Sequence, residues 1–392
     1  MASATELFNT SSMTAGGHYT NAELRFLKTT GRFPVASTAF YTLGDNSGGG
    51  MIVSTAQAPA DQHPYVASAR AVPQKIISLD GPGANNNTYW VGSYVLQNGD
   101  AYTWGTINFN ALGPRTTTNP TTPTILSGGP YKRLTNAGGT ATTLGMLKAN
   151  GELWVSGYNN TGNAGTGNTS VQNNARSGTA LWKDVAFYGE SSMGIKTDGT
   201  LWGWGSNANG RNGLGLTAGN TTTPTQIGTD TDWDKVMGGR DGGFVLKTDG
   251  RLYGFGSNTN GCLGTGDTSQ KTVPTQIGTR TGWRSASKST THSMFVHSDG
   301  TLWSVGLGSN FRRGYTATTT SNLTQVGTET HWTDVVVGAA SFIASTTAGG
   351  IWFAGSSNDG PFASDQPLTR ICRTDPTKTI LGTGIRHFLI GY

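Results

Sequence analysis

The sequence predicts an all-β fold, namely a seven-bladed β-propeller built from repeats of about 50 residues. Three observations lead to this prediction: a composition rich in glycine and poor in charge, turn glycines at a regular spacing, and aromatic residues that recur in phase with them. Of the 392 residues, 59 are glycine and only 12% are charged. This composition favours many tight turns joined by short strands over a helix-rich enzyme.

The turn glycines indicate an internal repeat. Asp198 and Gly199 lie between two short strand-like runs, and an Asp-Gly pair supplies the positive φ that a two-residue β-hairpin turn needs. Equivalent glycines recur about every 50 residues, as Gly49, Gly99, Gly151, Gly199, Gly250, Gly300 and Gly350. A unit of this length, with room for about four short strands, is the size of a propeller blade. Seven such units fill residues 35–392.

Within each predicted blade the elements follow in the same order. A strand precedes each glycine, at residues 40–42, 94–96, 146–148, 193–195, 244–246, 294–296 and 342–344. An aromatic-rich strand follows each of the last six glycines, and then come a Gly-rich corner and a Pro-Thr-Gln-aliphatic segment. An in-phase aromatic residue then begins the next unit, as Tyr131, Trp182, Trp233, Trp283 and Trp332.

The two chain ends stand apart from this pattern. An eighth copy of the strand that precedes the glycine, at residues 387–390, ends the chain with no hairpin after it. Because an open ring leaves unpaired N–H and C=O groups on two sheet edges, we expect this strand to dock beside the first repeat, so that both ends build the closing blade. Residues 1–34 match no repeat and contain one short helical pattern at 21–28, so we predict an N-terminal arm there, followed by the propeller at 35–392.

Two segments carry a resemblance to a known family. They are DGTLWGWGSNANGRNGLG at 198–215 and DGRLYGFGSNTNGCLGTGD at 249–267, each followed by TPTQIG and a strand that contains Trp. They resemble repeats of the regulator of chromosome condensation family, in a prokaryotic or phage-type version, and this resemblance implies a seven-bladed propeller. The family's eukaryotic founder is an exchange factor for a small GTPase and binds chromatin through a wedge insertion and acidic loops. Neither feature is matched here, and only one repeat, at His292, has the family's frequent histidine, so the resemblance does not carry exchange activity over.

The polar residues form no evident catalytic constellation. The residues before the hairpin glycines are Asn98, Asn150, Asp198, Asp249 and Asp299, and turn chemistry explains them. The Gly-rich run at 210–215 is followed by no Lys-Ser/Thr and opens no helix, which argues against a phosphate loop. The sequence therefore assigns no catalytic, cofactor-binding or metal-ligating residue and no cofactor, and it leaves the binding residues unknown.

The histidines, cysteines and tryptophans are expected to be structural. His292 and His297 are the two histidines that lie close in sequence, but five residues along a strand place them on opposite faces, so we expect surface or cross-strand histidines and no shared metal ion. Cys262 and Cys372 lie in different repeats, which implies neither a disulfide nor a thiolate metal site. The in-phase tryptophans are expected to pack between blades rather than to line a sugar-binding face; they are Trp202, Trp233, Trp303, Trp332 and Trp352.

The charge pattern narrows the function classes. The net charge of +5 is spread without any Lys/Arg run, which argues against a nucleic-acid groove, and no stretch approaches the ~20 apolar residues of a membrane span. We find no signal sequence. The leading hypothesis is a non-enzymatic scaffold: a structural, decoration or host-attachment component of a bacteriophage virion, assembled in the host cytoplasm. Its arm would bind other virion proteins, and its surface would bind a host glycan or receptor.

Two alternatives from other classes stay open. The first is an intracellular regulator that binds a small GTPase or chromatin, as the family's founder does. The second is a carbohydrate-active enzyme, because two carboxylates brought together from different blades are invisible in the sequence.

Overall fold

The computed structural model describes residues 38–41, 52–55, 76–80, 91–105, 124–137, 143–315, 318–348, 350–356, 365–373, 379–380 and 390–391. These residues form antiparallel sheets, and the helices among them are three single 3-10 turns, η3 (Ala208–Gly210), η4 (Thr259–Gly261) and η5 (Ser309–Phe311). No helix in the described part of the chain is long and apolar enough to cross a membrane. The predicted all-β class is confirmed.

The sheets divide into six four-stranded units, here called blades A to F. Blade A contains β3 (Ile76–Asp80), β4 (Val91–Leu96), β5 (Ala101–Gly105) and β6 (Thr124–Leu126). Blade B contains β7 (Tyr131–Ala137), β8 (Thr143–Lys148), β9 (Glu152–Gly157) and the first part of β10 (Gln172–Tyr188). Blade C contains the second part of β10, β11 (Ser191–Lys196), β12 (Leu201–Ser206) and β13 (Asn220–Ile227).

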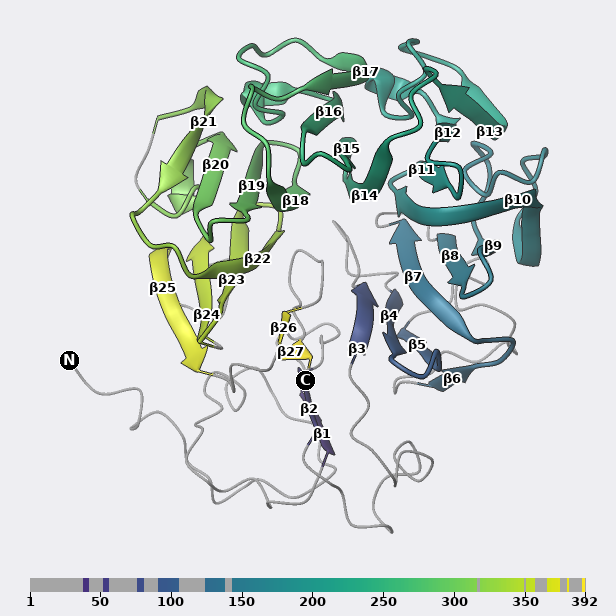
Figure 1. Cartoon of the computed structure of the whole chain (residues 1–392), viewed down its shortest axis with the longest axis horizontal. Coiled ribbons are helices and arrows are strands. Elements are labelled where there is room, and N and C mark those ends of the chain that lie inside the picture. The colour runs from purple at the N-terminus through teal and green to yellow at the C-terminus, as the bar shows by residue number, and fades with distance from the viewer. Residues whose placement is uncertain are drawn as a thin grey trace.

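The remaining three blades repeat this pattern. Blade D contains β14 (Trp233–Gly239), β15 (Gly242–Lys247), β16 (Leu252–Gly256) and β17 (Lys271–Gln276). Blade E contains β18 (Trp283–Lys288), β19 (His292–His297), β20 (Leu302–Gly306) and β21 (Thr320–Val326). Blade F contains β22 (Trp332–Val337), β23 (Ser341–Thr346), β24 (Gly350–Gly355) and β25 (Gln366–Arg373). Figure 1 shows the blades side by side around a ring, with the first strand of each innermost.

The hydrophobic core lies between the blades. Five clusters of buried residues each join the face of one blade to that of the next, from A/B to E/F. Between blades D and E, for example, Phe244 and Phe295 are fully buried with their ring centroids 5.0 Å apart, and Trp283 packs against Phe295 at 5.7 Å. The in-phase aromatic residues thus pack between blades, as expected.

The hairpin between the second and third strands differs in one detail from the prediction. Lys196 N–H bonds Thr200 O at 3.0 Å and Gly199 N–H bonds Lys196 O at 2.9 Å, which leaves a loop of three residues instead of two. Gly199 has φ +83° and ends this loop, an arrangement that a type I turn followed by a left-handed residue produces. A Cβ on Gly199 would collide with the backbone of Thr231, so both conformation and space require glycine.

In blades B to E the corner after the third strand forms a backbone hydrogen bond with the neighbouring blade. Gly215 N–H, from the corner of blade C, bonds Thr272 O in blade D at 2.9 Å, and Gly266 N–H bonds Ser321 O in blade E at 3.1 Å. The Gly-rich corners therefore join blades, which agrees with the rejection of a phosphate loop. The glutamine of the Pro-Thr-Gln segment caps the following turn, as Gln276 donates to Gly278 O at 2.9 Å.

One prediction near the C-terminal end is wrong, and other predictions near the chain ends concern residues that the structure does not describe. In the register of blade F, Ile351 pairs with Ser345 as Leu201 pairs with Ile195, so Gly350 takes the position of Thr200 and lies inside β24, and its assignment to the hairpin turn is wrong by one residue. Gly49, Gly349, the arm at 1–34 and the helical pattern at 21–28 lie outside the described residues.

The strands at the two ends lie near each other. β1 (Thr38–Tyr41) pairs with β2 (Ile52–Thr55), and β26 (Thr379–Ile380) pairs with β27 (Ile390–Gly391). β2 lies against β27, and β26 lies against β22 of blade F. These contacts are consistent with a closing blade built from both ends, and closure of the ring stays a prediction.

Candidate functional site

The blades expose a repeated arrangement at the end that carries the glycine hairpins, here called the hairpin end. In blade D, Trp233 begins the innermost strand, Lys247 ends the second strand directly opposite, and Tyr253 lies on the third. Lys247 Nζ is 4.8 Å from the centroid of the Trp233 ring and 5.6 Å from that of Tyr253. The ammonium group therefore stacks on an aromatic pair at the boundary between two blades.

The same arrangement recurs around the ring. Lys148 Nζ lies 4.6 Å from the Trp154 ring in blade B, and Lys196 Nζ lies 3.1 Å from the Trp202 ring in blade C. In blade E the lysine position holds His297, and Arg280 supplies the cation instead, with Cζ 5.0 Å from the Trp303 ring. The half-exposed tryptophans at this end are thus covered by the protein's own cations.

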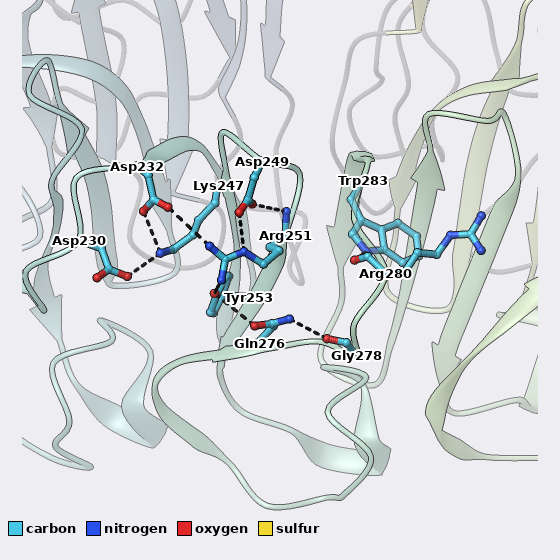
Figure 2. Close-up of polar contacts among 10 residues, drawn as sticks. All are labelled: Asp230, Asp232, Lys247, Asp249, Arg251, Tyr253, Gln276, Gly278, Arg280 and Trp283. Carbon is cyan, nitrogen blue, oxygen red and sulfur yellow. Dashed lines mark hydrogen bonds and ion pairs between the residues drawn. The ribbon is translucent and has the colours of Figure 1, made fainter.

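Blade D adds carboxylates to this arrangement (Figure 2). Lys247 Nζ lies 2.6 Å from Asp230 Oδ2 and 2.8 Å from Asp232 Oδ1. Arg251 Nε donates to Asp249 Oδ2 at 2.6 Å, and its guanidinium also lies 3.7 Å from Asp232. Only 6% of the Lys247 side chain is exposed, whereas 55% of Asp230 is, so the carboxylates form the outer layer. We call these five residues the blade D charge cluster.

The neighbouring turn in blade E carries a second, smaller ion pair. Arg280 donates to Asp299 Oδ2 at 2.6 Å, and its carbonyl oxygen accepts a hydrogen bond from Trp283 Nε1 at 3.1 Å. The Thr301 hydroxyl, which donates to Asp299 at 2.6 Å, is the main cause of a lowered pKa of Asp299, and His297 contributes. Asp299 is therefore a fixed negative charge at neutral pH.

Burial and the neighbouring carboxylates shift the pKa values of the lysines in opposite directions. Burial would lower the pKa of Lys247, but the hydrogen bonds to Asp230 and Asp232 outweigh it and raise that pKa. Burial lowers the pKa of Lys196, although the charge of Asp198 acts in the opposite direction. The arrangement thus holds cations in place, and it presents a mixed, ordered set of charges at one end of blades C to E.

Toward the ring axis, the innermost strands exchange polar contacts. Arg133 in blade B pairs with Asp184 in blade C at 2.6 Å, and Lys183 in blade C pairs with Asp234 in blade D at 2.8 Å. Ser285 in blade E bonds the carboxyl group of Asp334 in blade F, where burial raises the pKa of Asp334. These contacts join the innermost strands of consecutive blades.

The residues that the sequence singles out have clear places in the fold. The asparagines and aspartates before the glycines accept hydrogen bonds from the backbone N–H two residues on, as in Asp249 to Arg251 at 3.0 Å, so the turn interpretation is confirmed; the set is Asn98, Asn150, Asp198, Asp249 and Asp299. Cys262 is a buried free thiol, and the side chain of Cys372 lies outside the described residues.

The two histidines lie at opposite ends of β19. His297 contacts Arg280 and Asp299 at the hairpin end. His292 is fully buried at the other end, so of the two expected placements, surface or cross-strand, the surface one is wrong for it. Within the described residues no three His, Cys, Asp or Glu side chains are arranged to hold a metal ion.

The blade D charge cluster is the feature that sequence reasoning missed. Its signal is visible as the alternating acids of residues 229–234, TDTDWD, just before an in-phase tryptophan. The lysine and arginine that these acids meet lie 15 to 19 residues further on, and only the hairpin register brings them together.

Two family models match this chain, and both are named regulator of chromosome condensation (RCC1) repeat. One matches residues 249–296 and the other residues 182–211. Both segments lie in blades C to E, where the arrangement of lysine, tryptophan and acidic residues is most complete.

Solved structures of similar fold cover most of the chain. Yeast RCC1 (Prp20), in a structure with Kap60, has a TM-score of 0.70 at 17% identity, covering 98% of this chain and 95% of that chain. Prp20p of Saccharomyces cerevisiae has a TM-score of 0.68 at 18% identity, covering 91% and 92%. Human WBSCR16 has a TM-score of 0.67 at 18% identity, covering 82% and 88%. At such identities the likeness establishes the fold alone, and the two family models show that residues 182–211 and 249–296 are similar to RCC1 repeats.

Proposed function

We propose that this protein is a non-enzymatic binding module that contacts a partner protein through the hairpin end of blades C to E. The observation that carries the proposal is the blade D charge cluster. The side chains of its three aspartates are 39–55% exposed, while the lysine beneath them is buried. Side chains held in this way lose little conformational freedom on binding, which favours recognition.

The mixed signs of the exposed charges suggest what kind of partner fits. Asp230, Asp249 and Asp299 are negative, and Arg251 and Arg280 lie between them with 36% and 41% of their side chains exposed. Such a surface selects by matching charges on a folded partner and speeds its association at low salt. A uniformly basic nucleic-acid surface would look different.

The solved neighbours favour two partner classes. One structure is described by the binding properties of Prp20p to Gsp1p and histones, and another holds yeast RCC1 bound to Kap60. We therefore propose a GTPase-like or histone-like protein as the partner to test first.

The test is a binding measurement with purified partners. Arg251→Ala and Arg280→Ala should each weaken binding about tenfold, and the loss should shrink as salt rises. The matched control is Thr225→Ala, on the exposed outer strand of blade C. The proposal fails if Thr225→Ala weakens binding while both arginine variants bind like the wild type.

A finer proposal concerns the biological setting. We infer from the low charge and the Gly-, Thr- and Asn-rich turns a structural, decoration or host-attachment protein of a bacteriophage virion. The arm at 1–34 would then bind other virion proteins, and the propeller would present its surface to a host glycan or receptor. Mass spectrometry of purified particles tests this: peptides from blades B to F in constant ratio to capsid protein support it, and recovery only from the soluble host fraction contradicts it.

The alternative of a carbohydrate-active enzyme requires a particular pair of carboxyl groups. A glycosidase needs one carboxylic acid with a raised pKa beside an ionised carboxylate. Among the described carboxyl groups whose pKa is shifted, that of Asp334 is raised, and its partner is the hydroxyl of Ser285. This favours a binding module over a hydrolase.

A further inference from the structure

The lysine position at the hairpin end changes its chemistry in blade E. In blades B, C and D the residue opposite the start of the innermost strand is a lysine, namely Lys148, Lys196 and Lys247. Blade E has His297 there, opposite Trp283. A lysine ammonium group is charged at neutral pH, whereas an imidazole changes its charge between about pH 5 and 8. Blade E therefore has a group that titrates near neutral pH where three other blades have a lysine.

The imidazole ring of His297 is held in one orientation. It packs edge-on against Trp283, with the ring centroids 5.4 Å apart, and only 11% of its side chain is exposed. Its Nε2 atom lies 2.5 Å from the carbonyl oxygen of Thr281, so Nε2 carries a proton and donates it to this oxygen. The charge of the ring is then decided at Nδ1.

The Nδ1 atom faces groups that favour opposite protonation states. Asp299 Oδ1 lies 2.8 Å away and favours a protonated Nδ1. The backbone N–H of Asp299 and the guanidinium of Arg280 each lie 3.3 Å away, and they favour an unprotonated Nδ1 that accepts hydrogen bonds. Protonation of His297 therefore exchanges a hydrogen bond from Arg280 for an ion pair with Asp299.

Arg280 is coupled to this exchange through the same carboxylate. It donates to Asp299 Oδ2 at 2.6 Å, and we call Arg280, His297 and Asp299 the blade E triad. When His297 is neutral, its Nδ1 and the carboxylate both hold the guanidinium. When His297 is protonated, Arg280 loses one acceptor, meets a cation 3.3 Å away and shares the carboxylate with it. Because 41% of the Arg280 side chain is exposed, a loosened guanidinium can turn to an external anion.

Charged residues on the neighbouring elements do not take part in this exchange. Asp249 and Arg251, in the hairpin of blade D, pair with each other, and Arg280 extends away from them (Figure 2). Arg284 lies on β18, and Glu329 and His331 lie in the loop before β22. In the part of the chain that the structure describes, none of these five residues forms an ion pair or a hydrogen bond with the blade E triad.

We propose that His297 is a pH-dependent switch at the hairpin end, which on protonation takes up the Asp299 carboxylate and frees Arg280 to bind an external carboxylate, such as an acidic side chain of the partner. Asp299 stays ionised in both states because its pKa is lowered, so the triad gains one positive charge as the pH falls. The inference rests on the binding function proposed above for the hairpin end, and it adds the regulation of that surface.

The guanidinium 15N NMR signals of the full chain test the switch without any partner. The signal of Arg280, identified by its loss in Arg280→Ala, should shift between about pH 7.5 and 5.5 and follow the imidazole signals of His297. Arg251 is the internal control, because it pairs with Asp249 at 2.6 Å but has no histidine beside it, so its signal should stay constant. His331→Gln removes another histidine at the hairpin end and should leave the shift of Arg280 unchanged.

A short poly-glutamate peptide is the probe for the freed guanidinium. Read at the Arg280 signal, it should bind about threefold more tightly at pH 5.5 than at pH 7.5, which is the scale of one exposed charge. His297→Lys restores the lysine of blades B to D and should bind the peptide at both pH values as the wild type does at the lower one. His297→Gln keeps the position neutral and should bind at both as the wild type does at the higher one.

Two results would overturn the switch. One is an Arg280 signal that does not change as His297 titrates, and the other is a pH dependence of peptide binding that survives in both His297 variants. The proposed function fails by a different result: if the purified partner proteins bind at neither pH, the hairpin end is not their binding surface, while the NMR shift and the peptide response would still support the switch.

Discussion

The hairpin ends of blades C and D both place a lysine at the end of the second strand, but they shift its pKa in opposite directions. Lys196 and Lys247 each end a second strand opposite a tryptophan, and each stacks on an aromatic ring. Lys247 meets two carboxylates and its pKa is raised, whereas burial lowers the pKa of Lys196. The repeat therefore fixes where the cation lies, and the acids of the adjoining loop decide how strongly its charge is favoured.

His292 extends this comparison to its limit. It is a basic group that is fully buried, with two cations and no carboxylate among the charges that act on it. The three residues thus form a series in which the environment favours the charged form of Lys247, disfavours that of Lys196 and strongly disfavours that of His292, and each prediction below tests one part of it.

The largest effect concerns the rings beneath the cations. Trp182 is 1% exposed between blades B and C, so Trp182→Ala should lower the free energy of unfolding by about 3–5 kcal/mol. Trp202 only packs against that core from outside, and Trp202→Ala should cost about half as much. Chemical denaturation measures both, and equal losses would contradict the distinction between the two rings.

The next largest effect is the loss of folding stability that His292 causes as the pH falls. Because its folded pKa of about 3 is below the unfolded value, the folded state favours neutral imidazole, and this stability is full above about pH 6.5 and is lost as pH falls toward 3. Between pH 6.5 and 5 the loss is roughly 2 kcal/mol, at ~1.4 kcal/mol per unit. His292→Gln should make the free energy of unfolding depend less on pH between 6.5 and 5. An unchanged dependence on pH would show that His292 does not cause the acid sensitivity.

A smaller effect separates the two lysines at neutral pH. Lys247→Met keeps the aromatic contact but leaves Asp230 and Asp232 without their cation, and since both acids are more than a third exposed, the expected loss is about 1–2 kcal/mol. Lys196→Met should change stability by less than about 0.5 kcal/mol. Similar losses from the two substitutions would show that the carboxylates matter little.

The smallest predicted effect is the direction in which each lysine changes the Tm at alkaline pH. The raised pKa of Lys247 means that its contribution is full below the unfolded pKa of about 10.4 and is lost as pH rises through the folded value. The lowered pKa of Lys196 acts in the opposite sense, since the folded state favours the neutral amine. Between pH 9 and 11 the Tm of Lys247→Met should therefore fall less than that of the wild type, and the Tm of Lys196→Met should fall more.

The repeat could be predicted from the sequence because its signals are local. A glycine with positive φ, such as Gly199, and an Asp198 carboxylate that binds the N–H two residues on are determined within one turn. The one-residue error at Gly350 arose because the last unit has Ala348 in place of the usual Asp or Asn, so the adjacent pair of glycines could be aligned in two ways.

The candidate sites could not be predicted in the same way. Asp232 meets Lys247 only through the register of β14 and β15. This contact depends on the offset between the two strands, which a pattern read along the chain does not give.

The 17-residue strand β10 has a consequence for how the ring comes apart. It is the outer strand of blade B as far as Leu181 and the inner strand of blade C from Trp182, so seven strands share one hydrogen-bonded sheet. Blades D, E and F are joined to their neighbours by loops instead. We expect blades B and C to behave as one mechanical unit under force or proteolysis, and new chain termini to be tolerated at residues 228–232 or 278–282 but not within residues 172–188.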